Sequence, residues 1–136
     1  MQNQVYTGTP SSRRQWTLPN VATFATAGQP VLKGVTPGVT LDAYQSASLG
    51  CTVLENGSFG LTVIARSANS PLVTSQVNPG DQLYVSPNTG TFDAATNITY
   101  GFVLDKNPAG VPFGRYDESQ VAIPAGTTNT AAVVRI

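Results

Sequence analysis

The sequence predicts an all-β fold, a small β-barrel or β-sandwich of about seven or eight short strands. Two observations favour this class. Turn-forming residues recur roughly every 8–15 positions along the 136-residue chain, and short apolar runs separate them. Residues 43–49 form the only segment that favours a helical turn. The length predicts one domain with a real hydrophobic core.

The best-patterned part of the chain is the stretch 77–105. A turn at 78–81 leads into a strand at 82–86, a second turn follows at 87–90, and another strand is predicted at 98–104. The period-2 alternation of that last strand places four apolar side chains on one face: Ile98, Tyr100, Phe102 and Leu104. We expect this face to be buried.

A second pair of strands is predicted at 51–64, where Asn56-Gly57 is the preferred pair for a two-residue type I′ turn. Such a turn sets the register of a hairpin, so opposed residues share a face. The side expected in the core carries Leu54, Phe59, Leu61 and Val63.

Further short strands are expected at 29–33, 39–44 and 130–136. The last of these is so apolar that we expect it to be paired, in its own sheet or in that of a neighbouring copy. The stretches 65–76 and 105–120 show no period and are predicted to be loops.

Residues 1–28 differ from the rest of the chain, which we assign to one domain at 29–136. Pro10 and Pro19 favour an extended conformation, and the segment carries two arginines and no acidic residue. We interpret it as an N-terminal arm that docks on another protein; the alternative is a tail packed along its own domain. The expected anchors are Tyr6, Arg13, Arg14, Trp16 and Leu18.

The residue inventory argues against catalysis. The chain has no histidine and a single cysteine, Cys51, which excludes Ser–His–Asp and Cys–His sites and a cysteine-rich metal site. Asp81, Asp93 and Asp105 each occur where a turn favours an aspartate cap. We therefore expect no enzyme, no cofactor, no metal and no small-molecule substrate.

The charge balance bears on possible partners. Seven basic and seven acidic residues cancel, so no general attraction to nucleic acid or to an anionic membrane is expected. No signal peptide is predicted, and no apolar run approaches the ~18 residues that span a membrane.

Five segments, taken in order, resemble the small decoration or cement proteins of tailed-bacteriophage capsids. They are G-S-F-G-L-T-V (57–63), V-N-P-G-D-Q-L-Y-V (77–85), T-G-T-F (89–92), Y-G-F-V-L-D (100–105) and A-A-V-V-R-I (131–136). In that family a G-x-F-x-L strand precedes a G-D-x-V/L-Y strand, and a V-R-L type of strand ends the chain. The similarity covers about residues 28–136 and rests on the order and spacing of the motifs.

The resemblance implies a non-enzymatic structural protein of the virion. Such proteins are made in the host cytoplasm and bind the outer surface of the expanded head. They often form trimers at threefold or quasi-threefold positions and reinforce the shell. The implied partners are the major capsid protein and further copies of the chain itself.

The loop 105–120 is longer than the family pattern leads us to expect. We therefore add its exposed-type residues Arg115 and Tyr116 to the arm anchors as expected capsid or subunit contacts. The alternative function is a carbohydrate- or receptor-binding module of a head fibre, in which Trp16 and Tyr116 would stack on sugar rings.

Overall fold

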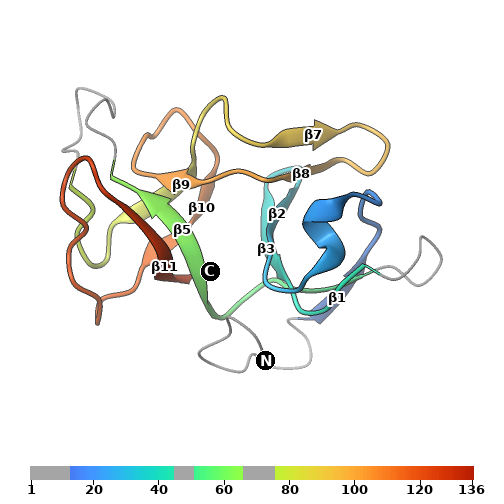
Figure 1. Cartoon of the computed structure of the whole chain (residues 1–136), viewed down its shortest axis with the longest axis horizontal. Coiled ribbons are helices and arrows are strands. Elements are labelled where there is room, and N and C mark those ends of the chain that lie inside the picture. The colour runs from blue at the N-terminus through green and yellow to red at the C-terminus, as the bar shows by residue number, and fades with distance from the viewer. Residues whose placement is uncertain (1–12, 45–50, 66–75) are drawn as a thin grey trace.

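Figure 1 shows the computed structural model of the chain, which describes residues 13–44, 51–65 and 76–136. These residues form eleven strands and one short 3₁₀ turn, so the all-β prediction is confirmed, with more strands than the seven or eight expected. The strands divide into a six-stranded sheet and a five-stranded closed barrel. The predicted helical turn at 43–49 lies largely outside the described residues.

The six-stranded sheet is antiparallel throughout, in the order β1-β4-β3-β2-β8-β7. β2 confirms the predicted strand at 29–33, whereas the strand expected at 39–44 lies earlier, as β3. The strands are β1 (Arg13–Trp16), β2 (Pro30–Lys33), β3 (Thr36–Thr40), β4 (Cys51–Leu54), β7 (Thr91–Asp93) and β8 (Ile98–Tyr100).

The barrel closes in the order β10-β11-β5-β9-β6, and β6 returns to pair with β10. Its pairs are antiparallel except for the parallel contact of β5 with β9. The strands are β5 (Ser58–Ile64), β6 (Gln82–Val85), β9 (Leu104–Asp105), β10 (Pro112–Tyr116) and β11 (Thr128–Arg135). The closing strand β11 pairs on both sides within its own barrel, which confirms that it is paired and shows that it is no edge.

The central strands of the sheet are buried on both faces, each face in a different core. Leu32, Val39 and Leu54 face the barrel and belong to the larger cluster, which fills the barrel. The opposite face is covered by the segment that follows β1, including the 3₁₀ turn η2 (Ala22–Ala25), whose Phe24 is fully buried. Barrel, sheet and N-terminal segment therefore form three layers, which Figure 1 shows from left to right.

The predicted hairpin at 51–64 is wrong. β4 pairs with β1 and β3, whereas β5 pairs with β11 and β9, so the two strands lie in different sheets. Asn56 does not have the positive φ that a type I′ turn needs. Gly57 instead exchanges two backbone hydrogen bonds with Ile136, of 3.2 and 2.9 Å. The four apolar residues expected in the core are nevertheless all buried.

The strand predicted at 98–104 is divided in two. Gly101 has a φ of +72°, outside the β region, and the chain leaves the sheet at β8 to enter the barrel at β9. The predicted loop at 105–120 is also corrected, because it contains the barrel strand β10. Alternation could not reveal the break at Gly101, since the apolar period continues across it, and the stretch 105–120 has no period that would indicate β10.

The described part of the predicted arm, residues 13–28, is built into the domain. β1 pairs along its whole length with β4, and Trp16, Leu18 and Phe24 bury their apolar surface against the sheet. The alternative of a tail packed along its own domain is therefore the one observed here. The separate arm is wrong for residues 13–28, and residues 1–12 lie outside the described residues.

The three aspartates expected as turn caps have that role. The carboxylate of Asp81 accepts from the backbone N–H of Asn78 at 2.7 Å, and that of Asp93 accepts from Thr96 at 3.0 Å. Asp105 accepts from the N–H of Asn107 at 2.9 Å. These local hydrogen bonds follow from the turn preference of aspartate.

Candidate functional site

The seven predicted contact residues do not form one site. Tyr6 lies outside the described residues. Trp16, Leu18 and Tyr116 are buried, with at most 4% of each residue exposed. The three arginines are exposed and lie on two separate surfaces, with Arg13 and Arg14 on β1 and Arg115 on β10.

Trp16 belongs to the core between the sheet and the N-terminal segment, together with Leu18 and Phe24, and does not anchor the chain on another protein. Its ring rests on the backbone of Gly38, where an added Cβ would lie 3.1 Å from the indole and 2.4 Å from Val53. The indole N–H donates to the carboxylate of Glu55 at 3.1 Å. The expectation that Trp16 and Leu18 are docking anchors is therefore wrong, because both side chains are buried in the core of their own domain.

Tyr116 is likewise a core residue of the barrel. Its hydroxyl donates to the backbone carbonyl of Val121 at 2.6 Å, and burial raises the pKa of the phenol. The expectation of a surface contact at Tyr116 is wrong. Because Trp16 is buried as well, neither ring offers a face on which a sugar could stack, and the carbohydrate-binding alternative loses the two residues on which it depended.

The first surface is the basic edge, defined here as Arg13 and Arg14 on β1, Lys33 at the end of β2, and Glu55. Arg14 lies 3.8 Å from the carboxylate of Glu55, whose other oxygen accepts from Trp16. The Nζ of Lys33 lies over the indole of Trp16, 6.0 Å from the ring centroid. These four residues carry three positive charges and one negative charge.

β1 is also the outermost strand of the sheet. Among the strands of the described residues it pairs with β4 alone, so its other edge carries backbone N–H and C=O groups outside the sheet's ladder. A strand edge of this kind can accept an extended segment of another chain. Basic side chains and an open edge therefore coincide at the N-terminal end of the described chain.

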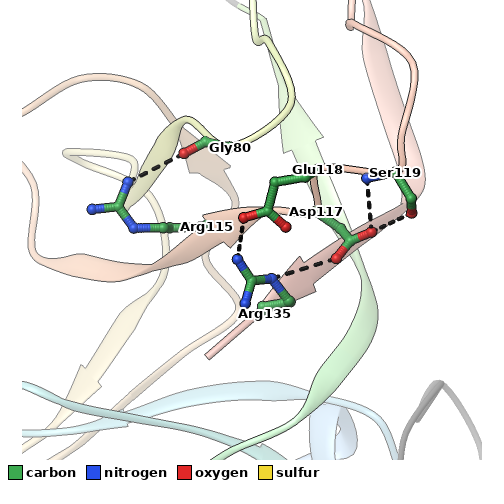
Figure 2. A network of polar contacts seen from close by, with 6 residues as sticks. All are labelled: Gly80, Arg115, Asp117, Glu118, Ser119 and Arg135. Carbon is green, nitrogen blue, oxygen red and sulfur yellow. Dashed lines mark hydrogen bonds and ion pairs between the residues drawn. The ribbon is translucent and has the colours of Figure 1, made fainter.

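The second surface is the arginine face, defined here as Arg115, Arg135, Asp117 and Glu118 on the outside of the barrel (Figure 2). Arg115 and Arg135 are direct partners in the register of β10 and β11. The Nε of Arg135 lies 3.4 Å from Asp117, and its guanidinium also binds Glu118. Arg115 instead donates to the backbone carbonyl of Gly80 at 3.1 Å.

Asp117 is held in place by its own loop. Its carboxylate accepts from the N–H of Ser119 at 3.1 Å and from the Ser119 hydroxyl. These hydrogen bonds, followed by the nearby Arg135, lower the pKa of Asp117 below its ordinary value. Asp117 is therefore ionised at neutral pH and fixes Arg135 from one side.

A surface hollow of about 410 Å³ adjoins the arginine face. Its lining is partly apolar and partly cationic, and comes from β6, β10 and the end of β11. The lining residues are Gln82, Pro112, Phe113, Gly114, Arg115, Arg135 and Ile136.

Sequence reasoning named none of the three carboxylates of these surfaces as contacts, and it missed two of the cations, Lys33 and Arg135. Both end a strand, and only the strand order places Lys33 beside Trp16 and Arg135 opposite Arg115. Among the described residues no group of three or more His, Cys, Asp or Glu side chains could hold a metal ion. Both surfaces carry charged side chains, and the basic edge adds the outermost strand of the six-stranded sheet.

Comparison with protein-family models, with curated proteins and with solved structures found no match for this chain. The helices of the described residues include none that is long and apolar enough to cross a membrane.

Proposed function

We propose that the protein is a structural component of a tailed-phage virion, which binds the outer surface of the capsid as a trimer at threefold or quasi-threefold positions and stabilises the shell. The order of motifs along residues 28–136 supports this proposal, and so does the all-β architecture. The proposed partners are the major capsid protein and further copies of the chain.

The observation that carries the proposal is the coincidence of Arg13 and Arg14 with the outermost strand of the sheet. Arginine binds carboxylates through two parallel hydrogen bonds, and a strand edge adds backbone hydrogen bonds without needing particular side chains. Both kinds of hydrogen bond would hold the protein on the surface of a shell. The contact thus belongs to the strand edge and its arginines, with Trp16 acting from beneath as support.

Binding of this kind stabilises a shell by mass action. A ligand that binds the assembled form and not its separate parts contributes RT ln(1 + [L]/Kd) at each site, about 2.7 kcal/mol at a hundred times Kd. A head carries many such sites, so a modest affinity at each is sufficient. No reaction is needed, which agrees with the lack of a histidine in the chain.

Co-sedimentation with expanded heads of the phage that encodes the chain tests the proposal. We expect saturable binding of the wild-type protein and a loss of at least about tenfold in affinity, or 1.4 kcal/mol, for R13Q/R14Q. The matched control is T128E/T130E, which makes the same change in net charge at exposed positions of β11. Its affinity should stay near that of the wild type.

Two results would count against the proposal. Absence of the wild-type protein from pelleted heads would refute capsid binding. Equal losses in R13Q/R14Q and in T128E/T130E would show that net charge, and not the basic edge, controls attachment. Far-UV circular dichroism and urea unfolding of each variant exclude a folding defect as the cause.

A further inference from the structure

We propose that Arg115 and Glu118 form the contact between copies of this chain, the guanidinium of one copy binding the carboxylate of the next. The inference rests on the self-association included in the proposed function and names the surface responsible. It is carried by the arginine face and is independent of the basic edge, which lies at the far end of the sheet.

The charges of the arginine face are unevenly shared. Two arginines and two carboxylates are present, yet both carboxylates bind Arg135. Arg115 has five N–H donors, and its one hydrogen bond within the described residues goes to the backbone carbonyl of Gly80. Figure 2 shows its guanidinium turned toward Gly80, with Glu118 turned toward Arg135.

The hydrogen bond of Arg115 to Gly80 contributes to the isolated fold, but the positive charge of Arg115 does not. Like charges that are directly opposed on an antiparallel pair are destabilising, and Arg115 is the direct partner of Arg135. Its hydrogen bond to Gly80 needs a donor but not a full charge. The unshared charge is therefore available to a carboxylate from outside the molecule.

Glu118 supplies such a carboxylate on the same face. Its side chain is 60% exposed, and a carboxylate offers about four acceptor sites. A face that carries both an unpaired guanidinium and an exposed carboxylate is complementary to itself. In a closed ring of copies, as in the proposed trimer, Glu118 of each copy satisfies Arg115 of the next and keeps its own bond to Arg135.

The adjoining hollow adds apolar surface to this contact. Pro112, Phe113 and Ile136 line it beside Arg115, so a second copy that covers the charges also covers part of this lining. Exclusion of water from the rim of such a contact strengthens the ion pair within it. A second copy therefore fits the face better than a free acidic small molecule does.

Charge reversal tests this pairing. The apparent dissociation constant for self-association is measured by sedimentation velocity of the wild type, R115E, E118R and the double variant R115E/E118R. Each single reversal sets like charges against each other at the contact and should weaken association at least tenfold. The double reversal restores opposite charges between copies and should recover association to within about threefold of the wild type. R13Q/R14Q is the control on the other surface and should associate as the wild type does.

Mixing R115E with E118R gives a second readout, since opposite charges then meet only between unlike copies. The mixture should associate more strongly than either variant alone. The inference is overturned if the wild type stays monomeric over the whole accessible concentration range, if R115E associates as the wild type does, or if neither the double variant nor the mixture recovers association while urea unfolding shows every variant folded.

Failure here is distinguishable from failure of the proposed function. Wild-type protein that associates through this pair but does not bind heads leaves the contact standing and removes the capsid role. Binding to heads without the charge-dependent association removes the contact and leaves the capsid role standing.

Discussion

Arg115 on β10 lies directly opposite Arg135 on β11, so that two guanidinium groups share one face of the barrel. Arg135 is balanced by Asp117 and Glu118, whereas Arg115 has a backbone carbonyl for its partner. The two arginines therefore contribute differently to the stability of the fold, although they are directly opposite each other in the strand register.

Removing the charge of Arg115 should stabilise the monomer against unfolding. We expect R115Q, which keeps a donor for Gly80, to raise the free energy of unfolding by about 0.5 kcal/mol at low salt. The gain should shrink in 1 M NaCl, because salt screens exposed charges. R135Q should have the opposite sign, since it leaves two carboxylates without their cation. Urea unfolding at low protein concentration measures both, and a loss of stability in R115Q would contradict the argument.

The burial of Trp16 predicts a large effect on stability. W16A should lower the free energy of unfolding by about 3–5 kcal/mol, because it empties a core position and leaves Glu55 without its indole donor. R13A, on the exposed side of the same strand, should change it by less than about 0.5 kcal/mol. Chemical denaturation tests the pair. A near-neutral W16A would mean that the ring is not part of the core.

Gly101 separates β8 from β9 and should tolerate side chains poorly. G101A should cost about 1–2 kcal/mol, because its φ of +72° is strained for alanine although nothing lies within 4 Å of an added Cβ. Asparagine visits this conformation more readily, so G101N should cost less. Gly60 is the matched control: its added Cβ would meet Ala131 at an ordinary 3.9 Å, and G60A should be close to neutral. Equal costs for all three variants in thermal unfolding would refute the strain argument.

Cys51 predicts an alkaline loss of stability. Burial, followed by its hydrogen bond to Asp42, raises the pKa of the thiol to about 12 from 9.0. The folded protein therefore holds a proton that the unfolded chain releases, so this contribution is complete below pH 9 and is lost as the pH rises toward 12. C51A should show a flatter dependence of unfolding free energy over that range. Parallel curves for C51A and the wild type would exclude the thiol as the cause.

Local patterns along the chain predicted which residues are buried. Leu54 and Phe59 were expected in the core from the register of a hairpin that does not form, yet both are buried, as apolar residues of central strands commonly are. Aspartates in turns were equally predictable, since Asp93 and Asp105 bond to backbone groups two or three residues away. Predictions of this kind involve neighbours in sequence only.

The pairing of strands was decided by the tertiary structure. Asn56-Gly57 favoured a hairpin, yet β4 pairs with β1 and β3, whereas β5 pairs with β11 and β9. Backbone hydrogen bonds can form with any strand that the fold brings alongside. The same holds for the candidate surfaces. Arg13 and Arg14 were evident in the sequence as a basic pair, but the position of β1 at a sheet edge was not.

The sequence by itself thus determined the all-β class, the buried faces, the turn caps and the lack of histidine-based chemistry. Only the tertiary structure decided that residues 13–28 belong to the domain, that Trp16 and Tyr116 lie in the core, and that Arg115 faces Arg135. The physical reason is range: burial and turns follow from residues close in the chain, whereas these three outcomes depend on contacts between segments that lie far apart in it.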